Sequence, residues 1–235
     1  MLSLLRETTH KKIVIVIPVY NDTQTIRQVA EGLLQQAPFQ IIIVDDGSAI
    51  PVNTTLQGLP IVCLRHQVNL GQGAALQTGF AYALNLQPDI IITFDADGQH
   101  AVNDLHALIQ PIIQQEAEVV LGSRFIEKYN NRIPFFRNIT LKTGRFVNYL
   151  FCGILLSDAH NGLRAFSRAA IEKIVITENR MAHASEILFE ISRHKLRYTE
   201  VPVTVQYTTY SRQKGQSSID SVKVLFDLIL HKLFR

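Results

Sequence analysis

Two carboxylates separated by one residue stand out in the segment Phe94-Asp95-Ala96-Asp97-Gly98-Gln99-His100. They close an apolar run, Ile90 to Phe94, that has the pattern of a strand buried on both faces. Carboxylates are poor strand formers, so Asp95 and Asp97 belong at the mouth of a sheet. Oxygen ligands at this spacing can hold a hard divalent cation that keeps coordination sites for substrate phosphates. A polar strand end without chemistry is the alternative for this triplet alone.

Polar residues follow two earlier apolar runs in the same way. Ile13 to Ile17 is a β-branched run, and we expect the chain to leave the sheet at Pro18-Val19-Tyr20-Asn21. The apolar spacing from Ile26 to Leu34 predicts a helix, and Ile41 to Val44 is a second strand that ends in Asp45-Asp46-Gly47-Ser48. Continuous apolar strands joined by a helix indicate a parallel sheet covered by helices. Ligands collect beyond the carboxyl ends of such strands, where all three polar segments fall.

The rest of the chain continues this alternation of strands and helices. Further strands are predicted at Ile61 to Leu64, at Val119 to Leu121, and at a sheet edge from Tyr198 to Tyr207; further helices are predicted from Gly71 to Leu86, Leu105 to Ile113 and Met181 to His194. The glycines of Gly71-Gln72-Gly73 would let backbone amides at a helix start approach a phosphate. A tight strand-to-helix turn explains them nearly as well.

Two segments near the end of the sequence each have two interpretations. Tyr210 to Ser218 has the composition of a mobile basic loop, either a solvated charge run or a lid that closes on a pyrophosphate. Ile219 to Arg235 has one apolar stripe. It is expected to be an amphipathic helix that either caps the core or lies in a membrane interface. We therefore expect one catalytic domain over residues 1–218 and a separate helix over residues 219–235.

Composition limits the class of protein. The 235 residues are 47% hydrophobic, which suits one sizeable α/β domain, and the net charge of +3 fits an anionic partner without requiring one. Cys63 and Cys152 both lie in apolar contexts, as buried thiols do in a reducing compartment. No apolar run approaches the roughly 18 residues of a membrane span, and the first residues lack the pattern of a signal peptide. The cytoplasm is therefore the expected location.

Four motifs occur in an order that is far more specific than any one of them: Ile17-Pro18-Val19-Tyr20-Asn21, Val44-Asp45-Asp46-Gly47-Ser48, Asn69-Leu70-Gly71-Gln72-Gly73 and Asp95-Ala96-Asp97-Gly98-Gln99-His100. Together they resemble the inverting nucleotide-sugar glycosyltransferases of family 2, which have the GT-A fold. The chain most resembles the dolichyl- or polyprenyl-phosphate sugar synthases, through Gly122-Ser123-Arg124, Asp158 to Phe166 and Arg212-x-x-Gly215-x-Ser217. The resemblance spans Ile13 to Ser218. It implies one α/β domain with a mostly parallel, Rossmann-like sheet flanked by helices.

The resemblance also implies roles for individual residues. The nucleotide base and ribose would be held by Pro18, Tyr20, Asn21 and Asp46, with Asp45 as a further candidate. Mg²⁺ or Mn²⁺ would be held against the diphosphate by Asp95, Asp97 and Gln99. The acceptor phosphate would be contacted by Arg124, Arg137 and Arg212. Further substrate contacts are expected at Gly71, Ala96 and Lys214, and the residues expected to matter most for catalysis are Asp97, Arg124 and Arg212.

The sequence departs from the pattern of the family in two ways. The acceptor-loop serine expected a turn after Arg137 has no clear counterpart between Ile139 and Gly144. The transmembrane helices that many relatives carry after the catalytic domain are missing from the sequence.

The relative numbers of arginines and carboxylates indicate the chemical class of the acceptor. A polyprenyl phosphate is already anionic at neutral pH and needs arginines to position it, whereas a sugar hydroxyl needs a carboxylate to take its proton. Arginines are abundant here, and carboxylates outside the metal triplet are few. The predicted function is transfer of a hexose from a UDP- or GDP-sugar to undecaprenyl or dolichyl phosphate in cell-envelope glycan synthesis. The protein would act at the inner, cytoplasmic face of the membrane.

Two alternatives stay open at this stage. One is elongation of a lipid-linked or free glycan, with Glu186 or Asp158 as the base. The alternative role of each of these two carboxylates is that of a structural or orienting group. The other is a non-catalytic subunit that binds a nucleotide sugar and partners a membrane protein. No nucleic-acid partner is expected. The transferred sugar and the oligomeric state are not indicated by the sequence.

Overall fold

The computed structural model describes residues 11–126, 149, 153–158 and 161–206. Within these residues one sheet has the strand order β3-β2-β1-β4-β6-β5-β7. The strands are β1 (Ile13–Val19), β2 (Gln40–Asp45), β3 (Val62–Arg65), β4 (Ile90–Thr93), β5 (Val119–Ser123), β6 (Arg164–Ser167) and β7 (Tyr198–Pro202). Neighbouring strands are parallel except that β6 runs antiparallel to both β4 and β5. The predicted α/β fold with a mostly parallel sheet is confirmed.

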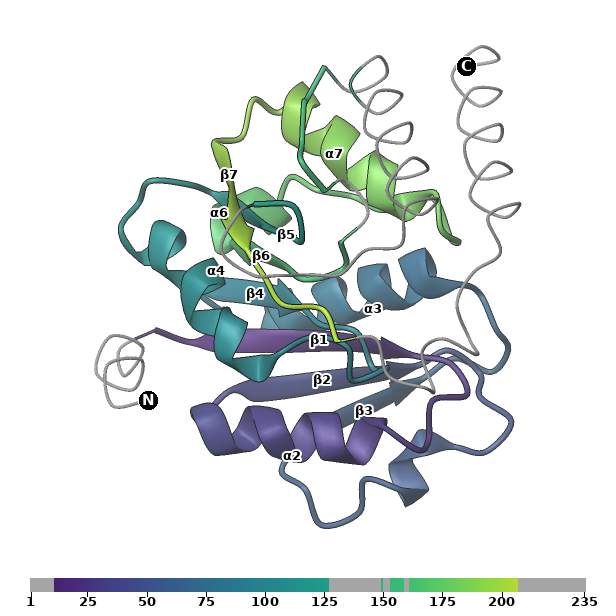
Figure 1. The fold of residues 1–235 in the computed structure, drawn as a ribbon. Coiled ribbons are helices and arrows are strands. Elements are labelled where there is room, and N and C mark those ends of the chain that lie inside the picture. Colours follow the sequence, from purple (N-terminus) through teal and green to yellow (C-terminus); the bar gives the residue numbers. More distant parts are fainter. Residues whose placement is uncertain (1–10, 127–148, 150–152, 159–160, 207–235) are drawn as a thin grey trace.

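Helices cover both faces of the sheet (Figure 1). They are α2 (Ile26–Gln36), α3 (Gln72–Asn85), α4 (Leu105–Ile113), α6 (Arg168–Ile171) and α7 (His183–Arg193), with short 3-10 helices η1 (Val52–Thr54) and η2 (Val102–Asp104). Apolar residues of α2 and α4 pack in one core cluster, and those of α3, α6 and α7 pack in a second one. The fold therefore has three layers, with the sheet in the middle.

The strands are buried on both faces, which explains their continuous apolar runs. Along β1, Ile15 and Ile17 belong to the core beneath α2 and α4, whereas Val14 and Val16 belong to the core beneath α3. All four side chains are 0% exposed. Because side chains alternate between the faces of a strand, a run without polar residues is what a sheet between two helical layers requires.

The sequence predicts that the first strand ends at Pro18, and this boundary is wrong. β1 continues to Val19 and pairs with β2 over its last residues. The Val16 carbonyl accepts the Phe94 N–H on the β4 side, and the Val19 carbonyl accepts the Asp46 N–H on the β2 side. The missing N–H of Pro18 therefore faces β4, which has already ended at this level. Proline is tolerated here because no ladder hydrogen bond is lost.

The segment after β7 reaches the edge of the sheet where the parallel strands end. β7 pairs with β5 and ends at Pro202, so it is shorter than the edge strand that the sequence predicts. Val205 then forms an isolated antiparallel bridge with His100, and the Gln206 N–H donates to the Gln99 carbonyl at 2.8 Å. This segment thus lies directly against the Asp95 to His100 turn.

Two expectations concern the membrane and the end of the chain. Among the described residues, no helix has the length and apolarity needed to cross a membrane. The expected amphipathic helix over residues 219–235 lies outside the described residues and stays a prediction.

Two helical glycines are expected to respond to alanine with opposite signs. A Cβ on Gly79 in α3 would lie 2.3 Å from Val16 Cγ1, whereas a Cβ on Gly32 in α2 would meet its nearest neighbour, Val102 Cγ2, at 3.6 Å. Gly79→Ala should lower the free energy of unfolding by about 1–3 kcal/mol through overpacking. Gly32→Ala should raise it by about 0.5–1 kcal/mol because alanine favours the helix. Urea unfolding of both variants tests this, and equal effects would contradict the packing of α3 on β1.

Candidate active site

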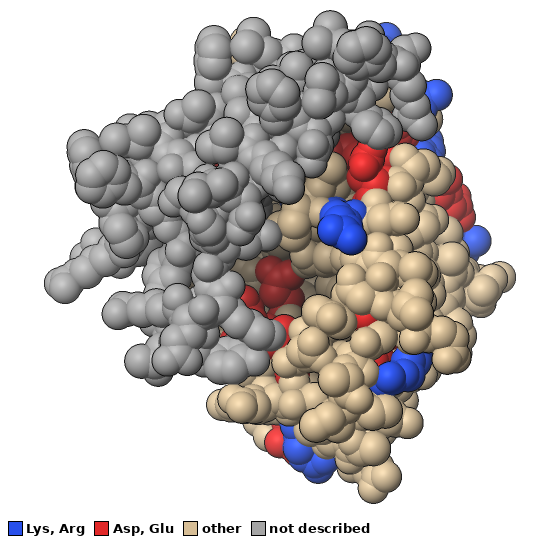
Figure 2. Space-filling model, turned by 90° about the vertical axis from the view of Figure 1, so that its right-hand side faces the viewer, with Lys and Arg blue, Asp and Glu red and all other residues tan. Residues whose placement is uncertain are grey.

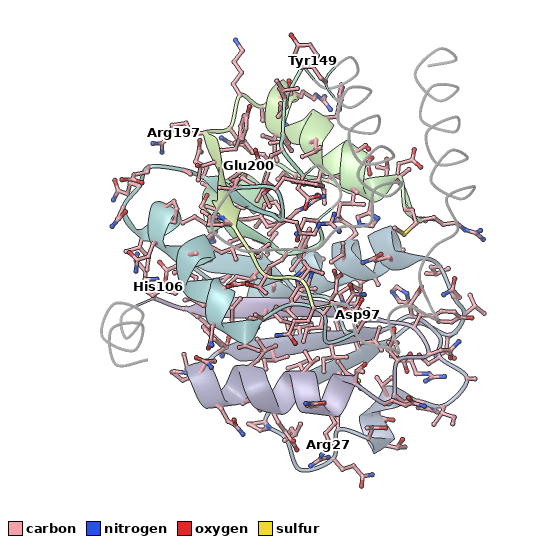
Figure 3. All side chains as sticks on the ribbon, viewed as in Figure 1. Arg27, Asp97, His106, Tyr149, Arg197 and Glu200 are labelled. Atoms are coloured by element: carbon pink, nitrogen blue, oxygen red, sulfur yellow. The ribbon has the colours of Figure 1, made fainter. Side chains whose placement is uncertain are left out.

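Polar residues gather at the carboxyl ends of β1, β2 and β4, as the sequence predicts. Figure 3 shows Asp97 near these strand ends, in the loop that follows β4. Figure 2 views this edge of the molecule and shows acidic side chains inside a hollow. The loops after the three strands therefore form one surface, and their side chains can act on one ligand.

The loops after β1 and β2 are locked together by one asparagine. The Asn21 N–H donates to Ser48 Oγ at 2.9 Å, and the Ala49 N–H donates to Asn21 Oδ1 at 2.9 Å. Asn21 has a φ of 58°, in the left-handed region that asparagine tolerates better than most residues. The preceding Tyr20 is 48% exposed. This turn therefore presents the Tyr20 ring at the surface while Asn21 fixes the backbone beneath it.

Asp46 organises the loop that leads into α3. Its carboxylate accepts the backbone N–H groups of Leu70 and Gly71 at 2.9 and 2.7 Å and the Asn69 side-chain amide at 3.0 Å. His66 Nδ1 lies 2.7 Å from the same carboxylate. Asp46 is 2% exposed. Its expected contact with the base or ribose stays a prediction, whereas its contacts within the protein explain why an aspartate is needed here.

Asp45 is equally buried and has its own set of partners. It accepts the Ser48 N–H at 2.9 Å and the Val52 N–H at 3.2 Å, and it pairs with Arg65 Nη1 at 2.5 Å. Asp45 is 1% exposed. The consecutive aspartates thus fix two different loops, the one after β2 and the one before α3. Any role of Asp45 at a ligand would be exerted through the loop that it shapes.

The glycines at the start of α3 give room to another backbone segment. A Cβ on Gly71 would lie 2.2 Å from the Asn179 carbonyl oxygen, and one on Gly73 would lie 1.9 Å from that of Glu178. The Gly71 N–H donates to Asp46, and the Gly73 N–H donates to the Asn179 carbonyl at 2.8 Å. Both amides therefore have protein acceptors. This geometry favours the tight-turn alternative over a phosphate cradle at these two amides.

Asp95 is surrounded by donors and by close backbone. Its Oδ2 lies 3.0 Å from His100 Nε2, and its Oδ1 accepts the Gln72 side-chain amide at 3.3 Å. A Cβ on Gly162 would lie 2.3 Å from Asp95 Oδ2, so only glycine fits against this carboxylate. Burial alone would raise the pKa of Asp95, but His100 and the nearby charge of Arg164 lower it below its ordinary value. Asp95 is therefore held as a carboxylate.

Asp97 is held by Gln99 and repelled by Asp95. The Gln99 N–H donates to Asp97 Oδ1 at 3.0 Å, and the Gln99 side-chain amide donates to Oδ2 at 2.7 Å. Burial, and next the charge of Asp95, raise the pKa of Asp97. The backbone carbonyl of Ala96, between the two aspartates, accepts the Thr25 hydroxyl at 2.7 Å. This turn therefore holds two like charges close together.

The acidic turn fits a hard divalent cation. Two carboxylates that repel each other are stabilised by a cation, and Mg²⁺ or Mn²⁺ prefers such oxygen ligands. The Gln99 nitrogen faces Asp97, so the amide oxygen is the atom of Gln99 that would ligate a metal. No group of three or more His, Cys, Asp or Glu side chains in the described part of the chain could hold a metal. Two carboxylates and one amide oxygen would leave coordination positions of such a cation open for phosphate oxygens.

Arg124, at the end of β5, is fixed by a buried carboxylate. Arg124 Nε and Nη2 donate to Asp158 at 2.6 and 2.7 Å, and the Arg124 N–H donates to the same group at 3.1 Å. The Asp158 side chain is 0% exposed. Burial would raise the pKa of Asp158, but Arg124 lowers it below its ordinary value. Asp158 is therefore an ionised group that orients the guanidinium, the role that the sequence left as an alternative to a base.

Glu200 on β7 holds the backbone that carries Asp158 (Figure 3). Its carboxylate accepts the Ser157 N–H at 2.9 Å and the Asp158 N–H at 3.1 Å. Sequence reasoning did not select Glu200, because a glutamate on an edge strand has no local signal for this contact. The other arginines expected at the acceptor, Arg137 and Arg212, lie outside the described residues, as does Lys214.

Glu186, the second candidate base, also has structural partners. Its carboxylate accepts the Thr177 N–H at 2.9 Å and the Glu178 N–H at 2.9 Å, and it bonds the Thr177 hydroxyl. Glu186 lies in the first turn of α7. It therefore ties the segment before α7 to the start of the helix, as an orienting group would.

Arg164 is a buried cation between the two halves of the site. It is 4% exposed, and its Nε–H donates to the Asn161 carbonyl at 2.9 Å. Burial lowers the pKa of Arg164 to about 10, while the charges of Asp95 and Asp158 oppose that shift. Arg164 stays protonated at neutral pH and compensates both carboxylates. No pattern in the sequence indicates this role for Arg164.

Comparison with known proteins identifies the family. Residues 14–175, more than half of the chain, match the family described as Glycosyl transferase family 2. The chain belongs to glycosyl transferase family 2. It is a glycosyltransferase, and the resemblance noted in the sequence is confirmed.

Relatives of this glycosyltransferase include enzymes named for lipid phosphates. It is 32% identical to the UDP-N-acetylglucosamine–dolichyl-phosphate N-acetylglucosaminyltransferase of Methanococcus voltae, over 95% of this chain and 97% of the relative. It is 25% identical to the polyprenol monophosphomannose synthase of Mycolicibacterium smegmatis, over 83% of this chain and 77% of that relative.

A solved structure confirms the GT-A fold. The glucosyl-3-phosphoglycerate synthase from Mycobacterium tuberculosis, crystallised with Mn²⁺, UDP and phosphoglyceric acid, matches this glycosyltransferase with a TM-score of 0.69. The match covers 95% of this chain and 80% of that chain, at 14% identity.

His183, at the start of α7, is expected to make this glycosyltransferase less stable in acid. Its Nδ1–H donates to the Arg180 carbonyl at 2.6 Å, and burial lowers its pKa from 6.5 to about 4. In the unfolded chain His183 takes up a proton as the pH falls below 6.5, whereas in the folded chain it stays neutral until about pH 4. This difference lowers the free energy of unfolding by about 3 kcal/mol across that window.

His183→Asn keeps an N–H donor and removes the titration. Urea unfolding between pH 7 and pH 4 should therefore show a shallower loss of stability in this variant than in the wild type. His194→Asn, at the exposed end of the same helix, is the control. Identical pH dependence in His183→Asn and wild type would contradict the burial of a neutral imidazole.

Proposed function

We propose that this glycosyltransferase transfers a hexose from a UDP- or GDP-sugar to a polyprenyl phosphate, undecaprenyl or dolichyl, in cell-envelope glycan synthesis. The relatives named for dolichyl phosphate and polyprenol support a lipid-phosphate acceptor. The observation that carries the proposal is that both candidate bases, Asp158 and Glu186, are already engaged in contacts within the protein. Asp158 is buried and paired with Arg124, and Glu186 is bonded to the backbone of the segment before α7.

The pKa and the partners of these carboxylates help to distinguish a hydroxyl acceptor from a phosphate acceptor. A hydroxyl acceptor must lose a proton as it attacks the anomeric carbon, and a base near neutral pKa serves this best. The pKa of Asp158 is lowered instead. An acceptor that is already ionised requires no base, only cationic groups that orient it. Arg124, held rigidly by Asp158, is suited to that task.

The donor would lie across the carboxyl ends of β1, β2 and β4. Asp95, Asp97 and Gln99 would hold Mg²⁺ or Mn²⁺, which neutralises charge on the departing diphosphate. The structure with Mn²⁺ and UDP on the same fold supports this for the family. Tyr20, exposed above the turn fixed by Asn21, would contact the nucleotide base.

The other residues predicted at the site are assigned to the donor and to the acceptor. Pro18 and the pair of aspartates at the end of β2 would shape the base and ribose site through the loops that they fix. Arg137, Arg212 and Lys214 would join Arg124 at the acceptor phosphate, each supplying charge-assisted hydrogen bonds. A lipid acceptor places the enzyme at a membrane surface, and we propose the inner, cytoplasmic face, with residues 219–235 at the interface.

Asp97→Asn should abolish transfer without unfolding the protein. The amide keeps the shape of the side chain and removes one of two repelling charges, so thermal stability should be equal or higher. Label moved from radioactive UDP- or GDP-sugars into organic-extractable polyprenyl phosphate should fall by about 100-fold or more, because a charged ligand of the cation is lost. Glu31→Gln, an exposed carboxylate paired with Arg27, is the control. Unchanged transfer in Asp97→Asn would exclude the assigned role.

Arg124→Lys should selectively weaken binding of the acceptor. Lysine keeps the charge but cannot reproduce the two-point contact with Asp158. The KM for polyprenyl phosphate should rise about tenfold, the equivalent of one good charge-assisted hydrogen bond, while the KM for the nucleotide sugar stays within about twofold. Arg197→Lys, an exposed arginine near Glu118, is the control. A rise in the donor KM with an unchanged acceptor KM would show that Arg124 acts on the donor and would contradict its assignment to the acceptor.

A further inference from the structure

His100 is a buried polar residue whose presence the fold does not explain. Its side chain is 6% exposed. Its Nδ1 is, among the residues that the structure describes, the one buried side-chain nitrogen or oxygen without a hydrogen-bond partner. A buried polar atom without a hydrogen-bond partner destabilises the folded state. An aromatic ring without nitrogen would avoid this cost at position 100.

The other ring nitrogen is directed at the acidic turn. His100 Nε2 lies 3.0 Å from Asp95 Oδ2. An ionised carboxylate can only accept a hydrogen bond, so Nε2 carries the hydrogen and donates it to Asp95. This contact sets the tautomer, and it leaves Nδ1 as the nitrogen without a partner.

The ring is held in place from two sides. Phe94 packs against it edge-on, with ring centroids 5.8 Å apart and an interplanar angle of 69°. The backbone of His100 is bridged to Val205, and the Gln99 carbonyl accepts the Gln206 N–H at 2.8 Å. The direction of the Nε2–H is therefore fixed by the core and by the segment that follows β7.

Gly162 confines the Asp95 carboxylate on another side. Gly162 packs closely against the Asp95 carboxylate, since a Cβ at this glycine would lie 2.3 Å from Oδ2. The Gly162 carbonyl is itself fixed by the Thr93 hydroxyl, which donates to it at 2.7 Å. Oδ2 thus lies between a hydrogen-bond donor and the Gly162 backbone, and Oδ1 accepts the Gln72 side-chain amide at 3.3 Å.

We propose that His100 is a positioning residue for the metal site, which fixes the rotation of the Asp95 carboxylate so that its oxygens are presented to the divalent cation. This inference rests on the proposed role of Asp95 as a metal ligand. Hydrogen bonds to metal-binding side chains orient the ligand, and their loss typically lowers metal affinity 10- to 100-fold. The unmade hydrogen bond at Nδ1 is then a cost in stability that is accepted for the donation at Nε2.

A phenylalanine and a glutamine at position 100 separate positioning from packing. His100→Phe keeps an aromatic ring against Phe94 and removes both nitrogens. The variant loses the hydrogen bond to Asp95 but also loses the unpartnered Nδ1, so the metal-free protein should melt close to the wild-type temperature. Its affinity for Mn²⁺ should fall 10- to 100-fold. His100→Gln retains a side-chain N–H that can reach Asp95 and should recover part of that affinity.

Calorimetric titration of the full-length protein with Mn²⁺ alone, paired with melting of the metal-free protein, tests the inference. Wild-type Mn²⁺ affinity in His100→Phe would overturn it, and so would a weakened affinity accompanied by a clear drop in the metal-free melting temperature, which indicates packing. Asp97→Asn is titrated in parallel. If Asp97→Asn also binds Mn²⁺ as the wild type does, the metal site of the proposed function is wrong, and the role of His100 falls with it.

Discussion

The repulsion between Asp95 and Asp97 is the constraint to which the surrounding structure responds. Two carboxylates one residue apart are held in a turn at the end of a buried strand, and the pKa of Asp97 rises partly because Asp95 is ionised. Asp95 stays ionised because His100 donates to it and Arg164 is buried nearby. The protein thus maintains an unfavourable pair of charges, which a divalent cation and an anionic diphosphate would convert into a favourable arrangement.

The antiparallel strand β6 connects the two halves of the site. Because β6 runs against β4 and β5, it begins where those strands end, and Arg164 pairs with Thr93 and Leu121 at that level. The residues just before β6 therefore lie at the ligand-binding edge. Asp158 holds Arg124 at one end of this segment, and Gly162 packs against Asp95 at the other. One short connection fixes groups that we assign to the donor and to the acceptor.

The sequence predicted the elements of the fold better than the contacts of its polar residues. Apolar runs located the strands because burial on both faces leaves a clear pattern, and the strand ends located Asp95 and Asp97. Pro18 was misjudged because its tolerance depends on where β4 ends, which is a property of the neighbouring strand. The structural contacts of Asp46 and Glu186 could not be predicted because many of their partners are backbone N–H groups, which every residue type except proline offers. Such contacts become visible only when distant segments are placed.

Local costs cluster where function is proposed. Asp97 carries a raised pKa and His100 has an unpartnered buried nitrogen, both in the loop that follows β4 at the carboxyl edge of the sheet. Among the described residues, no buried side-chain nitrogen or oxygen other than that of His100 lacks a hydrogen bond. A chain selected for stability alone would have removed these costs. Their concentration at one edge is therefore a physical argument that this edge binds a ligand, independent of any likeness to other proteins.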